Sequence, residues 1–297
     1  MNINQIINLY KILGKENIEV DYSLKEYTGF KIGEKAHFML MPTNVKMANK
    51  LFKFLNKFKL EYIVLGNATN VLITKSLDIV VSLKKLNTIK IKNNCVYCES
   101  GVSLFKLNEV LKDNNLSGLE RLYGIPGSVG GGIVQNCGAY SANISDNLTS
   151  AIVFDGKRLK KIKKQNLEFG YRTSIFKRKT NYIVLAGNFK LEYKEKEKIE
   201  KTLNDILTLR KSKQPYEYPS AGSVFKRIDG IYISKLIDEL GLKGKTIGGA
   251  KISEKHAGFI INYNNATSQD VLNLIHFVKN QVKCEKNIDL ELEIVVI

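Results

Sequence analysis

The chain has no long apolar run, since no segment reaches the roughly 18 consecutive apolar residues that a transmembrane helix needs. Its first residues, Met1-Asn2-Ile3-Asn4-Gln5, also lack the basic and then apolar layout of a secretory signal. We therefore expect no membrane insertion and a cytoplasmic location. With 297 residues, of which 44% are apolar, the chain is long enough for a sizeable core and for two domains.

Arginine is also scarce. The net charge is +17, but only six of the 46 cationic residues are Arg, and the lysines are spread along the whole chain. Base recognition and bidentate phosphate clamps favour Arg, and no basic-aromatic module accompanies the lysines. We therefore expect a solvated lysine-rich surface that attracts anionic small substrates, and no nucleic-acid partner. A protein without a cofactor, or a nucleic-acid-binding protein that uses this basic surface, is the alternative from a different functional class.

Cysteine offers no metal framework. The four cysteines are Cys95, Cys98, Cys137 and Cys284. Cys95 and Cys98 have the spacing of a zinc or redox pair, but no second pair follows and the residues between them are strand-like. Zinc and redox pairing stay as minor alternatives. We expect buried reduced thiols and no metal.

Helix-like and strand-like segments follow one another along the chain, without repeats or low-complexity tracts. The charge-rich residues 192–198 predict a domain boundary, with a first domain over 1–190 that splits near 75 into two α/β subdomains and a second over 191–297. Hydrophobic periodicity predicts helices at 45–58, 103–114, beyond 199, at 231–240 and after 267, and strands at 62–65, 71–73, 79–83, 95–98, 151–154, 182–186, 258–263 and 290–297.

The most informative segment is residues 123–140, which hold six glycines and one proline. Only glycine lets the main chain approach a ligand without a Cβ in the way, and successive backbone N–H groups bind anions. A second small-residue turn follows a predicted strand at residues 65–72. We therefore predict a phosphate-bearing cofactor held by loops. A Rossmann site is not indicated, because neither the glycine spacing nor the following acidic residue is present.

Seven motifs follow one another in a fixed order: Leu-Gly-Asn-Ala-Thr-Asn-Val-Leu (65–72), Gly-Ile-Pro-Gly-Ser-Val-Gly-Gly (124–131), Asn-Cys-Gly-Ala-Tyr (136–140), Tyr-Arg-Thr-Ser-Ile-Phe (171–176), Pro-Ser-Ala-Gly-Ser-Val-Phe-Lys (219–226), Gly-Gly-Ala-Lys-Ile-Ser-Glu-Lys-His-Ala-Gly-Phe-Ile-Ile-Asn (248–262) and Leu-Glu-Leu-Glu (290–293). Together they resemble the UDP-N-acetylenolpyruvoylglucosamine reductase family over roughly residues 20–297. The short chain, without an extra tyrosine-bearing loop after Arg172, resembles the shorter subclass of that family.

The resemblance implies an α+β fold: an N-terminal PCMH-type (vanillyl-alcohol-oxidase-like) FAD-binding region, followed by a smaller α+β C-terminal substrate domain that closes over it. It implies non-covalent FAD, NADPH as hydride donor and a UDP-sugar substrate, in a monomer that serves peptidoglycan synthesis, cell shape and division. Hydride passes to C3 of the enolpyruvyl ether and a proton to C2. The expected FAD contacts are Gly66, Asn67, Ala68, Thr69, Asn70, Ile125, Pro126, Gly127, Ser128, Gly130, Gly131, Asn136, Gly138 and Ala139.

Three residues match the catalytic groups of the family. Hydride addition builds negative charge on the substrate carboxylate, which a cation must stabilise, and Arg172 matches the family's arginine in that role. Ser223 matches the general acid and Glu293 its acidic partner, although Glu291 has the same strand parity. The expected substrate contacts are Tyr171, Arg210, Lys213, Lys226 and His256.

The chain departs from the family pattern at five positions, one of which is Thr69, where a serine is usual and the hydroxyl is kept. Glu34, Ala68 and Ser141 stand where a glycine is usual, and Arg227 where an asparagine is common. Ala68 requires a φ angle that alanine accepts, so this departure bears on FAD affinity. A sugar or hydroxy-acid oxidase of the same flavin fold is the alternative within the enzyme class, and the Ser223 and Glu293 motifs argue against it.

Overall fold

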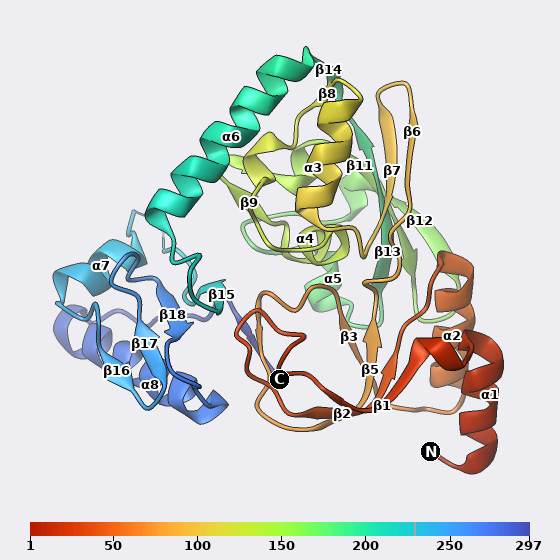
Figure 1. Cartoon of the computed structure of the whole chain (residues 1–297), viewed down its shortest axis with the longest axis horizontal. Helices are drawn as coiled ribbons and strands as arrows, with labels where there is room; N and C mark the ends of the chain where they lie inside the picture. The colour runs from red at the N-terminus through yellow and green to blue at the C-terminus, as the bar shows by residue number, and fades with distance from the viewer. Residues whose placement is uncertain (229) are drawn as a thin grey trace. The chain divides into compact units, whose positions relative to one another are not determined.

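The computed structural model describes residues 1–228 and 230–297, and the chain divides into two compact units (Figure 1). The first unit comprises Met1–Tyr22, Ala36–Asn67 and Leu77–Thr208. The second comprises Ser23–Lys35, Ala68–Ser76 and Leu209–Ile297. Packing thus divides the chain at 208/209 and adds two early segments to the C-terminal unit. The continuous domains 1–190 and 191–297 stay a prediction.

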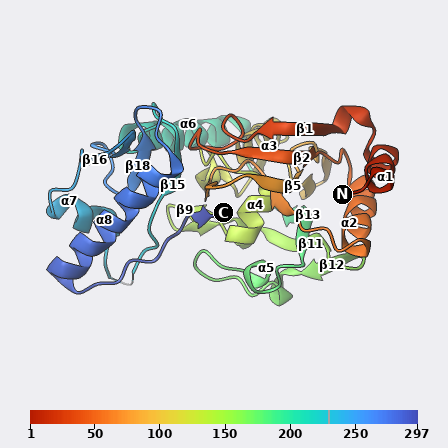
Figure 2. The ribbon, with the colours of Figure 1, turned by 90° about the horizontal axis from the view of Figure 1, so that it is seen from below.

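The first unit begins with two helices beside a four-stranded sheet, and α1 and α2 lie side by side (Figure 2). The sheet order is β1-β2-β5-β3, and β5 is parallel to both β2 and β3. Asn44 caps α2, whose Leu51, Phe52 and Leu55 are fully buried. The elements are α1 (Ile3–Leu13), η1 (Lys15–Asn17), β1 (Ile18–Ser23), β2 (Lys35–Leu40), α2 (Val45–Lys57), β3 (Ile63–Leu65) and β5 (Leu77–Ser82).

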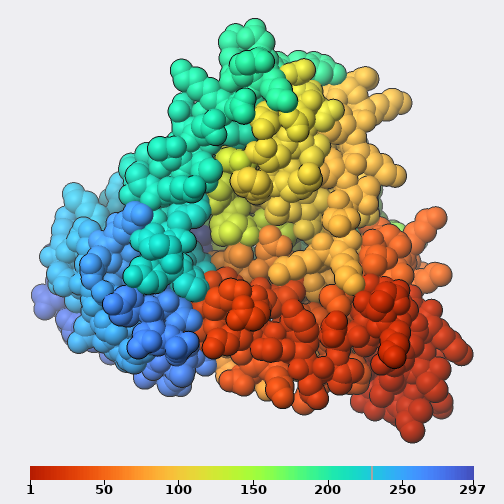
Figure 3. All heavy atoms as spheres, viewed as in Figure 1, coloured from red at the N-terminus to blue at the C-terminus, as the bar shows by residue number. Residues whose placement is uncertain are grey.

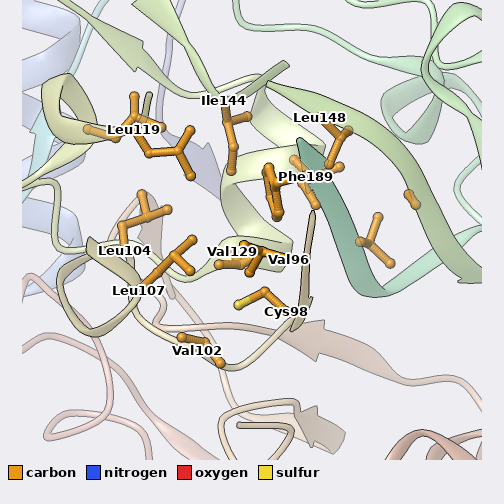
Figure 4. Close-up of a cluster of buried hydrophobic side chains, with 14 of the residues drawn as sticks. Val96, Cys98, Val102, Leu104, Leu107, Leu119, Val129, Ile144, Leu148 and Phe189 are labelled. Carbon is orange, nitrogen blue, oxygen red and sulfur yellow. The ribbon is translucent and has the colours of Figure 1, made fainter. Parts of the chain in front are cut away.

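The rest of the first unit is built on a five-stranded antiparallel sheet of order β12-β11-β13-β7-β6. Leucines and valines of α3 and α4 pack against it in the largest core cluster (Figure 4). The elements are β6 (Ile89–Lys92), β7 (Cys95–Glu99), α3 (Leu104–Asp113), β8 (Leu116–Ser117), η2 (Glu120–Leu122), α4 (Val129–Gln135), β9 (Gly138–Ala139), β10 (Ala142–Asn143), η3 (Ile144–Asp146), β11 (Leu148–Phe154), β12 (Leu159–Lys163), η4 (Lys164–Asn166), α5 (Ile175–Arg178), β13 (Ile183–Lys190) and β14 (Glu192–Tyr193).

The cysteines are placed differently from the sequence expectation. Cys98 is buried in the core near Val102 and Val129, and burial raises the pKa of its thiol (Figure 4). Cys95 is exposed, because residues three apart on a strand point to opposite faces. The expectation of buried thiols is therefore correct for Cys98 and wrong for Cys95 and Cys284, which is also exposed.

Helix α6 (Lys196–Lys213) begins inside the charged run rather than beyond it. Ile199 and Leu203 are buried beside Tyr123, and Ile206 and Leu207 complete one apolar face at helical spacing. The polar face forms part of the molecular surface seen in Figure 3. Lys196 and Lys198 are exposed, so the helix can begin among the charged residues that precede Ile199.

The second unit has a four-stranded antiparallel sheet of order β15-β18-β17-β16, with α7 and α8 sharing its core (Figure 2). Phe30 and Leu72 are fully buried in this core, which explains why their segments belong to this unit. The predicted helix after Thr267 is α8, which Thr267 caps with a capping box to Asp270. The elements are β4 (Val71–Leu72), β15 (Ser220–Ser223), α7 (Ile233–Glu239), β16 (Thr246–Ile247), β17 (Ala250–Ile252), β18 (Phe259–Asn262), α8 (Ser268–Lys286) and β19 (Val295–Val296).

The predicted final strand at 290–297 is shorter than expected. Only β19 forms a strand, pairing in parallel with β4, and Leu292 makes a single bridge to Phe225. Across the described parts of the chain, no helix combines the length and the apolar character that crossing a bilayer requires.

Candidate functional site

Within the first unit, the start of the predicted 65–72 loop lies against the start of the glycine-rich segment. The Asn67 side-chain amide donates a hydrogen bond to the Pro126 carbonyl over 3.1 Å. A Cβ on Gly66 would lie 2.4 Å from Oγ of Ser128, so the close approach of the loops requires glycine there. Gly66 and Asn67 are therefore held against the start of the glycine-rich segment.

The glycine-rich segment is a loop followed by the short helix α4, which the sequence analysis did not predict. Ser128 caps α4, and its hydroxyl accepts a hydrogen bond from the Gly131 N–H. The Gly130 N–H donates to the Ser100 carbonyl, and the Gly132 N–H donates to the Ser128 carbonyl. These two N–H groups serve the fold, so the expectation that the glycines donate to a ligand is wrong for them.

Gly127 and Gly131 differ from the packed glycines. A Cβ on Gly127 would approach no heavy atom closer than 3.7 Å, and one on the exposed Gly131 would meet only the Ser128 hydroxyl at 3.5 Å. Packing within the protein therefore does not require glycine at these two positions. A Cβ at either position would make only ordinary van der Waals contacts, so a glycine there is consistent with the close approach of a cofactor to the backbone.

A pair of substitutions separates these two kinds of glycine. Gly130→Ala should lower the free energy of unfolding by about 1–3 kcal/mol, because its Cβ would lie 2.6 Å from that of Ser100. Gly131→Ala should leave the unfolding free energy unchanged or raise it, while weakening FAD binding. Denaturant unfolding of the apoprotein and FAD titration by flavin fluorescence measure the two effects. Equal FAD affinity in wild type and Gly131→Ala would remove Gly131 from the cofactor site.

The far end of α4 is joined to the turn that carries Arg172. Asn136 ends the helix with φ 45°, and its side-chain amide donates to the Gly170 carbonyl over 2.9 Å. Nη2 of Arg172 donates to the Gly138 carbonyl over 2.9 Å, and the Ser174 hydroxyl donates to the Val134 carbonyl over 2.7 Å. The structure thus brings together Asn136, Gly138 and Arg172, which the sequence analysis named separately.

Ser223 and Glu293 lie on neighbouring backbone segments of the second unit. The Glu293 N–H donates to the carbonyl of Val224, the residue after Ser223, over 2.8 Å. The Asn70 side-chain amide donates to the Glu293 carbonyl over 3.2 Å. These two bonds join the Asn70 side chain to the backbone of Glu293, and the backbone of Glu293 to that of the residue after Ser223.

A β-bulge lies immediately before Ser223. Ser220 is paired with Ile261 and Ser223 with Phe259, so three steps along β15 match two along β18. Gly222 has φ +78°, and no atom lies within 4 Å of where its Cβ would be. Bulges reorient the side chains beside them, and they are frequent near active sites. A glycine is therefore favoured before Ser223 because the backbone there has a positive φ angle.

Two of the unusual family positions carry backbone strain. Ala68 has φ +52° and Ser141 has φ +63°, whereas Glu34 is outside the left-handed region. A left-handed conformation costs a residue with a Cβ about 1–2 kcal/mol. The doubt that the sequence raises about Ala68 is therefore physically justified. Its neighbour Thr69 lies close to Gly29, whose Cβ would be 3.1 Å from the Thr69 Cα and 2.7 Å from the Ser220 carbonyl oxygen.

The predicted substrate contacts have varied surroundings. Lys226 forms an ion pair with the exposed Glu291 over 2.8 Å, and this pairing lowers the pKa of the Glu291 carboxyl. Glu291 is therefore engaged by Lys226, while Glu293 is half-buried. Arg210 is only 4% exposed, whereas Lys213 in the last turn of the same helix is exposed. Tyr171 is also exposed, and the centre of its ring lies 5.1 Å from the Arg172 guanidinium carbon.

His256 is half-buried, and its Nδ1 accepts a hydrogen bond from the Gly258 N–H over 3.1 Å. Burial lowers the pKa of this imidazole, so the neutral form with its proton on Nε2 is favoured at neutral pH. The Nδ1 atom of His256 thus has a hydrogen-bond partner within the protein, and the Nε2–H group is its one remaining donor.

The sequence analysis assigned no role to Ser174 or Gly222, although both lie within the quoted motifs and next to residues with an assigned role.

The residues present fit a flavin. Among the described residues, the side-chain oxygen Oδ1 of Asn136 and the nitrogen Nε2 of Gln135 are buried without a hydrogen-bond partner. An isoalloxazine ring offers both a donor and acceptors to such groups. Within residues 1–228 and 230–297, no group of three or more His, Cys, Asp or Glu side chains is arranged to hold a metal ion.

Comparison with known proteins gives a consistent result along the chain. Residues 36–157 match the family model for an FAD binding domain, and residues 214–297 match that for the C-terminal domain of UDP-N-acetylenolpyruvoylglucosamine reductase. A reductase of that name from Clostridium perfringens is 40% identical over 98% of this chain and 97% of its own length. UDP-N-acetylenolpyruvoylglucosamine reductase 2 from Bacillus anthracis is 40% identical over 100% of this chain and 98% of its own length.

Solved structures agree with these sequence matches. The crystal structure of UDP-N-acetylenolpyruvylglucosamine reductase from Thermus caldophilus superimposes with a TM-score of 0.80 at 32% identity, covering 94% of this chain and 99% of that one. A glucose dehydrogenase at 15% identity shares the fold over 64% of this chain and 44% of its own, with a TM-score of 0.52. The predicted α+β, PCMH-type fold is confirmed.

Proposed function

Because the chain belongs to the UDP-N-acetylenolpyruvoylglucosamine reductase family, we propose that it reduces UDP-N-acetylglucosamine enolpyruvate to UDP-N-acetylmuramate with NADPH, in cytoplasmic synthesis of peptidoglycan precursors. Bound FAD would supply the redox chemistry, which is hydride transfer between NADPH and C3 of the enolpyruvyl group. The turn after β3, the start of the glycine-rich segment and Asn136 would hold it.

Arg172 stabilises the charge that develops on the substrate. Hydride arrival at C3 pushes electron density through C2 into the carboxylate, so this group gains negative charge in the transition state. The guanidinium meets that charge from a fixed position, because Nη2 is tied to the Gly138 carbonyl and the turn is anchored to α4 through Asn136 and Ser174. A preorganised cation needs little reorganisation during the reaction.

Ser223 delivers the proton to C2. A serine hydroxyl is a weak acid, so it serves only when held against a developing carbanion. The bulge before Ser223 and the pairing of Val224 with Glu293 hold its backbone on both sides. Glu293 orients the intermediate from the next segment, and Tyr171, Arg210, Lys213, Lys226 and His256 are the proposed contacts to the UDP-sugar.

The hydrogen bonds that join Asn70, Glu293 and Val224 support this proposal, because they tie the backbone of Glu293 to a predicted flavin contact and to the residue after Ser223. Purified protein should be yellow, its flavin should bleach on anaerobic addition of NADPH, and the colour should return on addition of the enolpyruvyl substrate. NADH in parallel measures the nucleotide preference.

A control separates the two alternatives. An oxidase of the same flavin fold would be reduced directly by sugars or hydroxy acids without NADPH, which we expect not to happen. Colourless protein that FAD does not reconstitute would contradict every flavin reading and favour the flavin-free alternative.

A further inference from the structure

The hairpin that carries Gly138 has an unusual turn. Strands β9 and β10 pair antiparallel with Ala139 opposite Ala142, so the connection consists of Tyr140 and Ser141 alone. Their φ angles are +51° and +63°, which places both residues in the left-handed region that a type I′ turn requires. Asn-Gly and Gly-Gly are the usual residues there, because other side chains are strained at positive φ. The Tyr-Ser sequence therefore does not by itself stabilise this turn.

An arginine from another segment contacts the peptide between these two residues. Nη1 of Arg121, in η2, donates a short hydrogen bond to the Tyr140 carbonyl oxygen. The orientation of that carbonyl depends on ψ of Tyr140 and φ of Ser141, so a bond to it restrains both angles. η2 also packs beside β9 and β10. A guanidinium donor makes such a bond stronger than a neutral donor does.

The same hairpin positions a carbonyl that Arg172 uses. Gly138 stands two residues before Tyr140 in β9, and its carbonyl oxygen accepts the bond from Nη2 of Arg172. No side chain fits at Gly138, since a Cβ would lie 2.3 Å from the Asn143 side-chain oxygen Oδ1 and 2.4 Å from the Ala142 carbonyl oxygen. Gly138 in β9 therefore packs closely against Ala142 and Asn143 of β10, and a rotation in the turn that joins the two strands would move the Gly138 carbonyl.

We propose that Arg121 is a positioning residue: it holds the Tyr140–Ser141 turn in its left-handed form and so keeps the Gly138 carbonyl where Arg172 is anchored. In this chain, Arg121 stabilises the left-handed turn by a hydrogen bond from another segment, whereas a glycine at position 141 would stabilise it by having no Cβ. The consequence for turnover rests on the proposed function of Arg172, whereas the clamp on the turn does not.

The test combines three variants: Arg121→Met, Ser141→Gly and the double variant. In Arg121→Met, amide hydrogen exchange of the peptide that spans residues 137–143 should speed up about tenfold, because the turn opens more often. Turnover of the enolpyruvyl substrate should fall by a similar factor, while flavin reduction by NADPH stays at the wild-type rate. Adding Ser141→Gly should restore both exchange and turnover to within about threefold of wild type, since glycine removes the strain that the clamp resists.

Arg158→Met is the matched control, because Arg158 is an exposed arginine outside this hairpin and should change neither readout. Thermal unfolding of each variant checks that the fold persists. The proposal is overturned if exchange at 137–143 is unchanged in Arg121→Met, or if Ser141→Gly fails to restore it. Exchange is measured without substrate, so a chain that lacked the proposed activity would still pass or fail this test on its own.

Discussion

Ser223→Ala should leave flavin reduction by NADPH near the wild-type rate and lower oxidation of the reduced enzyme by the enolpyruvyl substrate by about 10²–10⁴-fold, the usual contribution of a positioned proton donor. Loss of the hydroxyl removes only the proton for C2 and leaves the flavin loops untouched. Stopped-flow absorbance of the flavin, recorded separately for the two half-reactions, measures the split.

Ser220→Ala is the natural control for this variant, since Ser220 begins the same strand and is half-buried like Ser223. We expect both of its half-reactions to stay within about twofold of wild type, as for a substitution away from the chemistry. If Ser223→Ala lost both half-reactions to the same extent, the residue would be supporting the fold or the flavin, and its role as proton donor would have to be abandoned.

Arg172→Met should slow substrate reduction by about 10²–10³-fold, as loss of one group that stabilises transition-state charge does. Reduction of the flavin by NADPH should persist, because Arg172 is proposed to act on the substrate carboxylate and the Asn136 bond to the turn remains. The same stopped-flow separation applies, together with the Kd of the oxidised enzyme for the enolpyruvyl substrate.

Arg178→Met provides the comparison, because Arg178 is an exposed arginine six positions further along that pairs with Glu168 at the surface. Such surface pairs contribute little, so this variant should behave as wild type. A wild-type turnover in Arg172→Met would exclude Arg172 from the site, and Arg172→Lys should recover part of the rate because it keeps the positive charge.

Local patterns predicted local structure well. The helix from residue 103 is confirmed as α3 with Ser103 as its cap, and the helix after Thr267 is confirmed as α8. Both have apolar residues at helical spacing and a capping residue, which act within a few residues of one another. The role of each glycine in the glycine-rich segment was harder to predict, because a sequence does not distinguish a glycine that approaches a ligand from one that packs against Ser100, as Gly130 does.

The sequence by itself determined the family, the fold class and the residues to test, because each motif is a short stretch whose chemistry is legible without its surroundings. Only the tertiary structure decided which of these residues meet. Asn70 and Glu293 are hydrogen-bonded although they are 223 positions apart, and residues 23–35 and 68–76 pack with the C-terminal unit. The strained turn at Tyr140 and its contact with Arg121 likewise depend on the path of the whole chain. Backbone angles and long-range contacts are set by the packing of distant segments, and no local pattern records that packing.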